Sequence, residues 1–375
     1  MKKLLVFLTV LMLVSVTVGC MPKTVVPTTQ VAPQTTTTST DKRPYWPTQE
    51  WRGVTTAEKQ DMDSTTLDRM TSYVQDSALE VNSVIVIRHG YIVYEKYFRA
   101  PWNRDKIHNI YSCTKSVMSS LVGIAVQQGK IKSLNDKMVD YFPNRTIRNL
   151  DERKKSITLL NLMTMKAGFD WAERTYPYTD PRNPMVQAHL SNDIIQFVLD
   201  RPMATQPGTI WAYNGGCSLI FSAIVTNKTG MSTLEFAKKN LFSPLGITKL
   251  TWRTDRQGIY DAGGGLSMTP RDMAKYGYLI LNRGVWEGKQ IIPADFVAES
   301  VKTQTTFNAN AGYGYQSWWT VPVDGYYYAA GIKGQRIYVV EKQDMLLVTT
   351  GNLPEDSQTE TKMRKIAQYA ISACK

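Results

Sequence analysis

The chain has 375 residues, of which 43% are hydrophobic and 20% charged, and its formal net charge is +12 at pH 7. This length allows one large or two modest domains, and the basic residues are scattered, which favours a solvated basic surface over a nucleic-acid-binding face. The spacings of the four cysteines and three histidines match no zinc motif, so we expect neither a disulfide scaffold nor a catalytic metal.

The first twenty residues have the pattern of a secretory signal. Lys2 and Lys3 precede an uncharged apolar run over 4–18, which is too short for a spanning helix. The cysteine directly after Gly19 resembles a bacterial lipobox, in which the thiol is acylated and becomes the mature N-terminus. We therefore expect a signal peptide over 1–19 and a lipid anchor at Cys20. This anchor would hold the protein on a membrane of the cell envelope, outside the cytoplasm, with plain secretion as the alternative.

Residues 20–50 predict a disordered tether behind that anchor. The segment is rich in Thr, Pro, Gln and Ser and contains few bulky apolar residues, so it cannot bury enough surface to fold.

Regular structure is predicted to begin with a helix and a hairpin. Apolar residues recur at helical spacing over 67–78 behind Asp63 and Ser64, which can cap the helix start. Two β-rich runs, 83–87 and 91–98, follow it. The turn between them contains His89 and Gly90, whose glycine can adopt the positive φ of a tight hairpin.

A strongly apolar helix follows, and it opens with Ser112-Cys-Thr-Lys115. Positions three apart share a helix face, so Lys115 lies one turn from the Ser112 hydroxyl near the helix N-terminus. The helix-end amides favour developing negative charge, and apolar surroundings favour an amine that can lose its proton, which suits nucleophilic catalysis. The alternative is a purely structural role, with a serine that caps the helix and a lysine on the surface.

A tyrosine stands at the start of a later apolar helix. Tyr213 follows a turn at Pro207 and Gly208 and can be directed into a cleft, where the Lys115 cation would favour a phenol that takes the Ser112 proton. A structural tyrosine with a satisfied hydroxyl is the alternative. Further along, Thr269 and Pro270 with Asp272 predict the capped start of another helix.

Short runs typical of β-strands occur again near the C-terminus, over 326–329, 335–340 and 345–350. A predicted helix over 361–373 follows them. Strands from both chain ends must then meet in one antiparallel sheet flanked by the terminal helices. The sequence thus predicts an α+β fold, with a sheet domain from 51–111 and 302–375, an inserted mainly helical domain over 112–301, and a cleft between them.

These segments together resemble the serine β-lactamase and penicillin-binding-protein superfamily, in particular its class C-like branch of esterases and 6-aminohexanoate-dimer hydrolases. The resemblance runs from about Arg52 to the C-terminus. It rests on five segments: 112–131, 159–171, 207–216, 263–273 and 331–340. It implies a β-lactamase/transpeptidase-like fold and acyl transfer, in which Ser112 attacks a carbonyl, forms an acyl-enzyme and is released by water, without a cofactor.

The resemblance also implies the remaining site residues. The backbone N–H groups of Ser112 and Ile332 would form the oxyanion hole, and a glycine at Gly331 would let substrate backbone approach closely. Substrate contacts would come from the following residues: Gly331, Lys333, Asn214, Gly215, Trp171 and Tyr178. For Trp171 and Tyr178, packing against the domain is the alternative.

Two departures from the family pattern bear on the substrate. The family's Y-x-N motif has asparagine where this chain has Gly215, and Lys333 follows the glycine of the third motif instead of preceding it. Both departures weigh against β-lactam and D-Ala-D-Ala recognition.

Two other nucleophile arrangements are disfavoured. Cys113 faces away from Ser112 on the helix, and His108 has no acid assigned to it.

Two function classes are left. The first is a hydrolase of a small-molecule or peptide amide or ester, with Lys115 and Tyr213 as the base and later the acid. The second is a non-turnover protein that binds or senses penicillin or cell-wall peptides.

Overall fold

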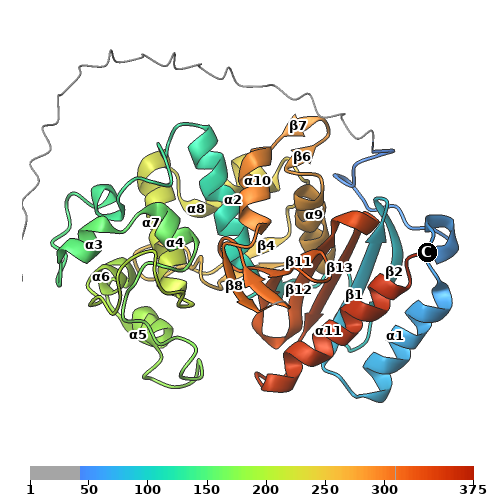
Figure 1. The fold of residues 1–375 in the computed structure, drawn as a ribbon. Coiled ribbons are helices and arrows are strands. Elements are labelled where there is room, and N and C mark those ends of the chain that lie inside the picture. Colours follow the sequence, from blue (N-terminus) through green and yellow to red (C-terminus); the bar gives the residue numbers. More distant parts are fainter. Residues whose placement is uncertain (1–42, 309) are drawn as a thin grey trace, which may run out of the picture. The chain divides into compact units, whose positions relative to one another are not determined.

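Strands from the two ends of the chain lie side by side in one sheet. A computed structural model describes residues 43–308 and 310–375; the predicted signal peptide and Cys20 lie outside them. In this part of the chain an eight-stranded antiparallel sheet has the order β2-β1-β13-β12-β11-β10-β9-β8 (Figure 1). Its strands are β1 (Val81–Arg88), β2 (Tyr91–Tyr97), β8 (Thr305–Asn308), β9 (Ala311–Tyr313), β10 (Trp318–Val321), β11 (Tyr326–Gly331), β12 (Gln335–Val340) and β13 (Met345–Gly351). The predicted α+β fold with an antiparallel sheet is confirmed.

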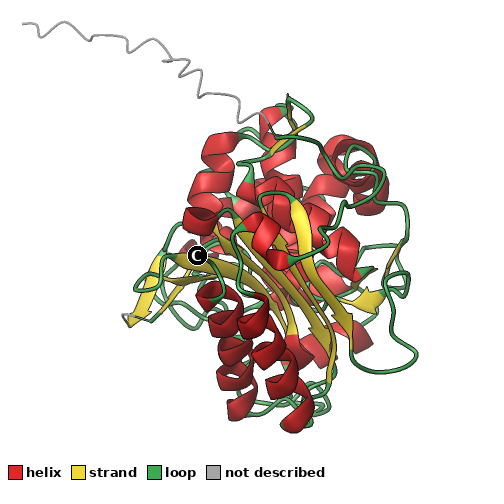
Figure 2. Ribbon diagram, turned by 90° about the vertical axis from the view of Figure 1, so that its right-hand side faces the viewer, coloured by secondary structure: helices red, strands yellow, loops and turns green. Residues whose placement is uncertain are grey.

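The central strands divide the core because successive side chains point to opposite faces of the sheet. In β1, Val84 and Val86 pack on one face, whereas Ile85 and Ile87 pack on the other. β12 and β13 alternate in the same way. The sheet therefore lies between two layers of helices, as Figure 2 shows.

The terminal helices cover one face. They are α1 (Ser64–Asp76), whose start is capped by the Asp63 side chain, and α11 (Ser357–Ser372), and they pack against each other (Figure 1). Their buried residues, including Met70, Met363 and Ile366, form a core with the outer-facing strand residues. The predicted hairpin is present too, with φ of 51° at His89 and 86° at Gly90 in its turn.

The opposite face carries α2 (Cys113–Gln127) and α9 (Pro270–Leu281). α9 comes from the segment that was expected in the helical domain, yet it packs on β12 and β13, with Gly277 close against Ile337. Its Thr269 cap is as predicted, because the hydroxyl accepts from the Asp272 N–H at 3.1 Å.

Several of the remaining helices of the described residues pack on α2 or on one another. The helices are α3 (Glu152–Ser156), α4 (Leu159–Met163), α5 (Pro184–Leu190), α6 (Ile194–Leu199), α7 (Gly215–Thr229), α8 (Thr233–Ala237) and α10 (Ala294–Val301). The short turns are η1 (Ala57–Gln60), η2 (Met138–Tyr141), η3 (Lys238–Phe242), η4 (Ile332–Gly334) and η5 (Glu341–Gln343). The minor strands are β3 (His108–Asn109), β4 (Leu250–Trp252), β5 (Leu266–Met268), β6 (Val285–Trp286) and β7 (Lys289–Gln290). Over 43–308 and 310–375, no helix combines the length and apolar character that crossing a membrane requires.

The predicted tether boundary at residue 50 is wrong, because the chain already packs on the folded part from residue 43. Trp46 lies with its ring 5.7 Å from Tyr278 and 5.2 Å from Trp286. Arg43 pairs with Asp344 at 2.5 Å. Packing of Trp46 against Tyr278 of α9 and Trp286 of β6 orders a stretch whose Thr, Pro and Gln content indicated disorder. The earlier part of the predicted tether lies outside the described residues.

Candidate active site

Ser112 stands on a tight turn from β3 into α2. Tyr111, directly before it, has a φ of 46°, an uncommon conformation for a residue with a side chain, and its N–H donates to the Asn109 side chain at 2.8 Å. Ser112 is the N-cap of α2, but its hydroxyl makes no capping hydrogen bond. Ser112 is a partly exposed residue, and it lies at a helix end that favours developing negative charge.

Lys115 lies one turn further along α2, with only 1% of its surface exposed. Its Nζ donates to Ser112 Oγ at 3.2 Å and to the Gly263 carbonyl at 2.5 Å. The Tyr213 ring centroid is 4.9 Å from the same nitrogen. The structure thus brings together all three residues of the predicted catalytic group.

The charge of Lys115 differs from the expected one. Burial alone lowers the pKa of Lys115, but the interactions with Tyr213, Glu173 and Asp261 outweigh burial and raise it above the ordinary value. The expectation that apolar surroundings would lower this pKa is therefore not met, because the neighbouring acidic groups favour the charged form of the amine.

A buried aspartate fixes the loop that carries the Gly263 carbonyl. Asp261 is 2% exposed and its Oδ1 accepts from the N–H groups of Gly263 and Gly264 at 2.9 and 3.1 Å. Its Oδ2 pairs with His189 and Arg253. Burial raises the pKa of Asp261, but these partners outweigh it and hold the pKa far below its usual range. The loop therefore presents its carbonyl to Lys115 from a rigid support.

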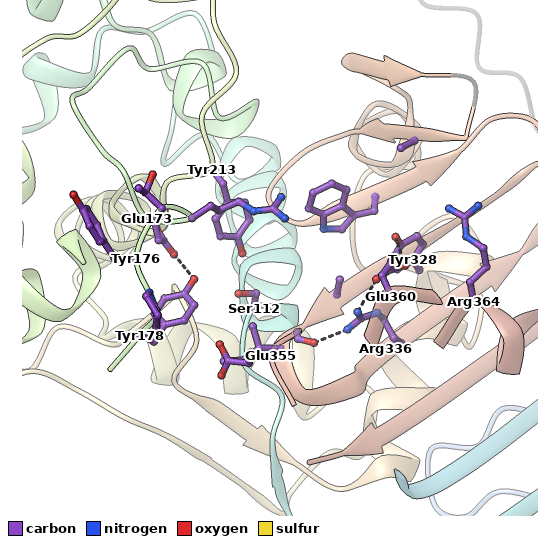
Figure 3. A pocket seen from close by; sticks show the side chains of 18 residues that line it. Ser112, Glu173, Tyr176, Tyr178, Tyr213, Tyr328, Arg336, Glu355, Glu360 and Arg364 are labelled. Atoms are coloured by element: carbon purple, nitrogen blue, oxygen red, sulfur yellow. Dashed lines mark hydrogen bonds and ion pairs between the residues drawn. The ribbon is translucent and has the colours of Figure 1, made fainter. Parts of the chain in front are cut away.

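Ser112 opens onto a cavity of about 600 Å³. Figure 3 shows Tyr213 above Ser112 with its hydroxyl directed toward the serine, and Tyr178 on the neighbouring wall. Gly331 and Ile332, from the end of β11, line the cavity as well. In the described residues, no backbone carbonyl outside the helices and strands accepts the N–H of Ser112 or Ile332. Ser112 and Ile332, whose amides were predicted to form the oxyanion hole, thus both line the cavity.

Arg336 closes the cavity beyond the end of β11. This arginine is 6% exposed, and it pairs with Glu360 of α11 at 2.8 Å and donates to the Gly331 carbonyl at 2.5 Å. Tyr328 donates to the same glutamate at 2.9 Å, and Arg364 lies further along this wall (Figure 3). The far end of the cavity is thus charged and fixed by hydrogen bonds.

Sequence reasoning missed Glu173, which lies in the loop between Trp171 and Tyr178. Its side chain is 2% exposed and accepts hydrogen bonds from Trp171 Nε1 at 2.7 Å, from the Tyr178 hydroxyl at 2.7 Å and from the Gly215 N–H at 2.5 Å. No motif of the resemblance contains this residue. A lone acidic residue between aromatic ones was the only signal in the sequence.

Four predicted substrate contacts lie away from the cavity wall. Trp171 is 6% exposed and packs in the core, with its N–H on Glu173. The Asn214 side chain caps α7 by accepting from Cys217, and Gly215 is buried against Glu173. Lys333 has its Nζ 5.7 Å from the Tyr111 ring. The geometry does not support substrate contact by these four residues.

Gly331 lines the cavity, but the reason for glycine differs from the expected one. A Cβ at this position would lie 2.3 Å from the Ile110 carbonyl oxygen, so the space is taken by protein backbone and not reserved for substrate. Tyr178 lines the cavity as predicted.

The alternative nucleophile and base remain disfavoured. Cys113 is fully buried, and burial raises the pKa of its thiol to about 12. His108 stacks on Trp102 at 4.0 Å, and burial lowers its pKa to about 4. Its Nε2 contacts the Thr350 hydroxyl at 3.4 Å, and no acidic side chain of the described residues bonds to it. In the same part of the chain, no group of three His, Cys, Asp or Glu side chains is arranged to hold a metal ion.

Comparison with known proteins gives the chain relatives and structural neighbours. The Beta-lactamase family model matches residues 67–370. The 6-aminohexanoate-dimer hydrolase of Paenarthrobacter ureafaciens is 25% identical over 299 residues, which cover 73% of this chain and 73% of the relative.

Two solved structures share the fold. The octameric penicillin-binding protein homologue of Pyrococcus abyssi has a TM-score of 0.64 at 18% identity, covering 82% of this chain and 76% of its own. The hydrolase EstCE1, described as having promiscuous acyltransferase activity, has a TM-score of 0.69 at 14% identity and covers 81% and 98%. The architecture is therefore β-lactamase/transpeptidase-like.

Proposed function

The chain belongs to the β-lactamase family, and on this premise we propose that it hydrolyses a small-molecule or peptide amide or ester through an acyl-enzyme on Ser112. The observation that carries the proposal is the position of the Ser112 hydroxyl. It lies at the N-terminus of α2, 3.2 Å from the Lys115 ammonium, and opens onto a cavity of about 600 Å³ beside Tyr213.

In the acylation step, Ser112 Oγ forms a bond to the carbonyl carbon of the substrate. Its proton passes to the Lys115–Tyr213 pair, which acts as the general base. The proton then moves to the leaving amine or alcohol as the carbon–nitrogen or carbon–oxygen bond breaks. The same Lys115–Tyr213 pair therefore serves first as the base and then as the acid.

The oxyanion of each tetrahedral intermediate would bind to the N–H groups of Ser112 and Ile332. Two such donors, fixed before the reaction begins, typically accelerate acyl transfer by about 10²–10³-fold each. In deacylation, water attacks the ester, Tyr213 takes one of its protons, and the acid product leaves as Ser112 regains its proton. These reaction steps require no cofactor.

The class of substrate is suggested by the relatives and by the cavity. The relative from Paenarthrobacter ureafaciens is named for hydrolysing an amide dimer. Tyr176, Tyr178 and Trp319 offer apolar surface in the cavity, and Arg174 and Glu355 offer charge. A linear amide or ester of small size fits this lining, whereas Gly215 removes the amide side chain that the Y-x-N motif supplies. We propose no nucleic-acid partner.

We also propose that the mature protein is anchored by a lipid on Cys20 and works outside the cytoplasm. The support is the basic start of the chain, the apolar run over 4–18 and the cysteine after Gly19. Labelling with a clickable palmitate analogue, compared with Cys20→Ser, tests the anchor. Equal labelling of the two proteins would contradict it.

A panel of acyl substrates tests the activity. The panel holds p-nitrophenyl esters, nitrocefin, D-amino-acid peptides and aminohexanoate oligomers, with Ser112→Ala as the control, alongside a fluorophosphonate label. We expect turnover of at least one amide or ester and labelling of the wild type alone. A penicillin adduct that persists without turnover would support a sensor instead, and equal hydrolysis by Ser112→Ala would refute the role of Ser112.

A further inference from the structure

We infer that Arg336 is a positioning residue of this site, because it holds the peptide group that supplies the second oxyanion donor. The inference rests on the proposed function, in which the N–H groups of Ser112 and Ile332 bind the oxyanion. Arg336 does not touch the reacting atoms in this scheme. It acts through the carbonyl group of Gly331, to which its side chain donates.

The first argument is the geometry of the peptide group between Gly331 and Ile332. Its carbonyl oxygen accepts from Nη1 of Arg336 at 2.5 Å. The carbonyl of Gly331 and the N–H of Ile332 belong to one trans peptide group, which is planar, so the two bonds point in opposite directions. A donor that fixes the carbonyl therefore also fixes the direction of the N–H.

The second argument is the place of this peptide group beside the turn that carries Ser112. A Cβ on Gly331 would lie 2.3 Å from the carbonyl oxygen of Ile110, which precedes the serine by two residues. Ser112 and Ile332 line the same cavity as Arg336. In the view of Figure 3, the dashed line from Arg336 to this carbonyl runs to the side on which Ser112 lies. The N–H, which points away from Arg336, is therefore directed to the side where the oxyanion would form.

The third argument is that Arg336 is itself held in place. Only 6% of its surface is exposed. Its Nη2 donates to the carboxylate of Glu360 at 2.8 Å, and its Nη1 also donates to the Gln335 carbonyl at 2.9 Å. Glu360 in turn accepts from the Tyr328 hydroxyl at 2.9 Å. Because the guanidinium is a rigid planar group, these hydrogen bonds define its orientation toward the Gly331 carbonyl.

Neutral groups hold the rest of the turn. The Gln335 side chain, which is 1% exposed, donates to the carbonyls of Ile332 and Lys333 at 3.3 Å each, and to that of Gly351 at 2.8 Å. The bond from Arg336 is shorter than these three and has a charged donor, and charge-assisted hydrogen bonds are roughly twice as strong as neutral ones. Of these side-chain bonds, the one from Arg336 should therefore govern the position of the Ile332 N–H.

The cation also strengthens the N–H as a donor. Hydrogen bonds that share a peptide group polarise one another, so a guanidinium on the Gly331 carbonyl favours a negative oxygen on the Ile332 N–H. The oxyanion develops in the transition state and is absent from the bound ester. This contribution therefore lowers the barrier and leaves substrate binding nearly unchanged.

The test is the steady-state hydrolysis of p-nitrophenyl butyrate by Arg336→Met, whose side chain is unbranched and has no donor. We expect kcat and kcat/KM to fall by the same factor, about 10–10²-fold, because the lost interaction is made only in the transition state. KM should stay within about threefold of the wild-type value. Rates are taken per active site, counted as the amount of protein that a fluorophosphonate labels at completion.

Two control variants separate this role from a general loss of charge or structure. Lys333→Met removes a cation from the same turn, whose Nζ lies 5.7 Å from the Tyr111 ring. Arg271→Met breaks another arginine–glutamate pair, with Glu95 at 2.7 Å, and neither partner lines the cavity. Both variants should keep kcat within about threefold of the wild type, although Arg271→Met should lower the midpoint of urea unfolding.

A second variant covers the case in which Arg336→Met does not fold. The single substitution leaves the Glu360 carboxylate without its cation, and breaking a buried pair in this way is strongly destabilising. Arg336→Met combined with Glu360→Gln removes both charges, and the glutamine still offers an oxygen atom to Tyr328. The same fall in kcat at constant KM is expected from this double variant.

The outcomes are distinguishable from failure of the proposed function. A folded Arg336 variant whose kcat lies within about threefold of that of Lys333→Met would refute the inference alone. An unchanged kcat with a raised KM would also refute it, because Arg336 would then act in substrate binding. A wild type that is neither active nor labelled beyond the level of Ser112→Ala would refute the proposed function itself.

Discussion

Replacing Gly331 with alanine should disable the oxyanion site while leaving the fold intact. The added methyl group would lie 2.3 Å from the Ile110 carbonyl oxygen, roughly 1 Å inside van der Waals contact. That carbonyl also accepts the N–H of Cys113 at 3.2 Å, so it is part of the turn that places Ser112. Relief of the clash must therefore separate the amide of Ser112 from that of Ile332.

A displacement of this size in a site fixed before the reaction typically costs about 10²-fold in rate. We expect kcat for the best ester of the panel to fall by about 10²–10³-fold, as for the loss of one oxyanion donor. Gly264→Ala is the matched control, because a Cβ there meets its nearest atom, in Tyr111, at an ordinary 3.7 Å. Gly331→Ala with kcat within about threefold of Gly264→Ala would refute the reasoning.

Three other predictions concern the base, a buried histidine and a helix cap. Tyr213→Phe should lower kcat/KM by about 10²–10⁴-fold in initial-rate assays, and a change below about tenfold would argue against its role as base. The pKa of His108 is about 4 in the folded chain against the usual 6.5, so the unfolded chain binds this proton first as the pH falls. The contribution of His108 to the free energy of unfolding is therefore fully present above pH 6.5. It is lost as the pH falls towards 4, and roughly 2 kcal/mol is lost at pH 4.5. Urea unfolding at pH 7 and pH 4.5 should show a smaller loss in His108→Gln, and an equal loss would count against this account. Thr269→Ala should lower the free energy of unfolding by about 1 kcal/mol without changing kcat.

Sequence patterns were sufficient to predict the elements whose structure depends on neighbouring residues. Short runs rich in β-branched and apolar residues predict β1, β12 and β13. The caps at Asp63 and Thr269 are visible because a capping side chain bonds within its own turn. The proximity of Ser112 and Lys115 also follows from helix geometry. Tyr213, about a hundred residues further along the chain, was singled out by its place between a turn and an apolar helix, and no periodicity predicts that it meets Ser112.

The strands at the sheet edge were missed because glycine and polar residues interrupt their pattern. β8 to β10 include Gly312, whose missing side chain leaves room for the Thr320 hydroxyl at 2.5 Å from its ideal Cβ position. Trp171 was assigned to the substrate wall because aromatic residues in a loop suggest exposure. Its indole is instead packed in the core, with its N–H bonded to Glu173, and no sequence pattern predicts this contact.

The glycine at position 215 and the carboxylate at position 173 belong to one arrangement beside α7. A Cβ on Gly215 would lie 3.1 Å from Glu173 Oε2 and 2.6 Å from Met185 Sδ, so a side chain at position 215 would compete with the Glu173 carboxylate for the same space. The same carboxylate accepts from the hydroxyl of Tyr178, which lines the cavity. Any substitution that releases Tyr178 from Glu173 should therefore alter the substrate selectivity of the site.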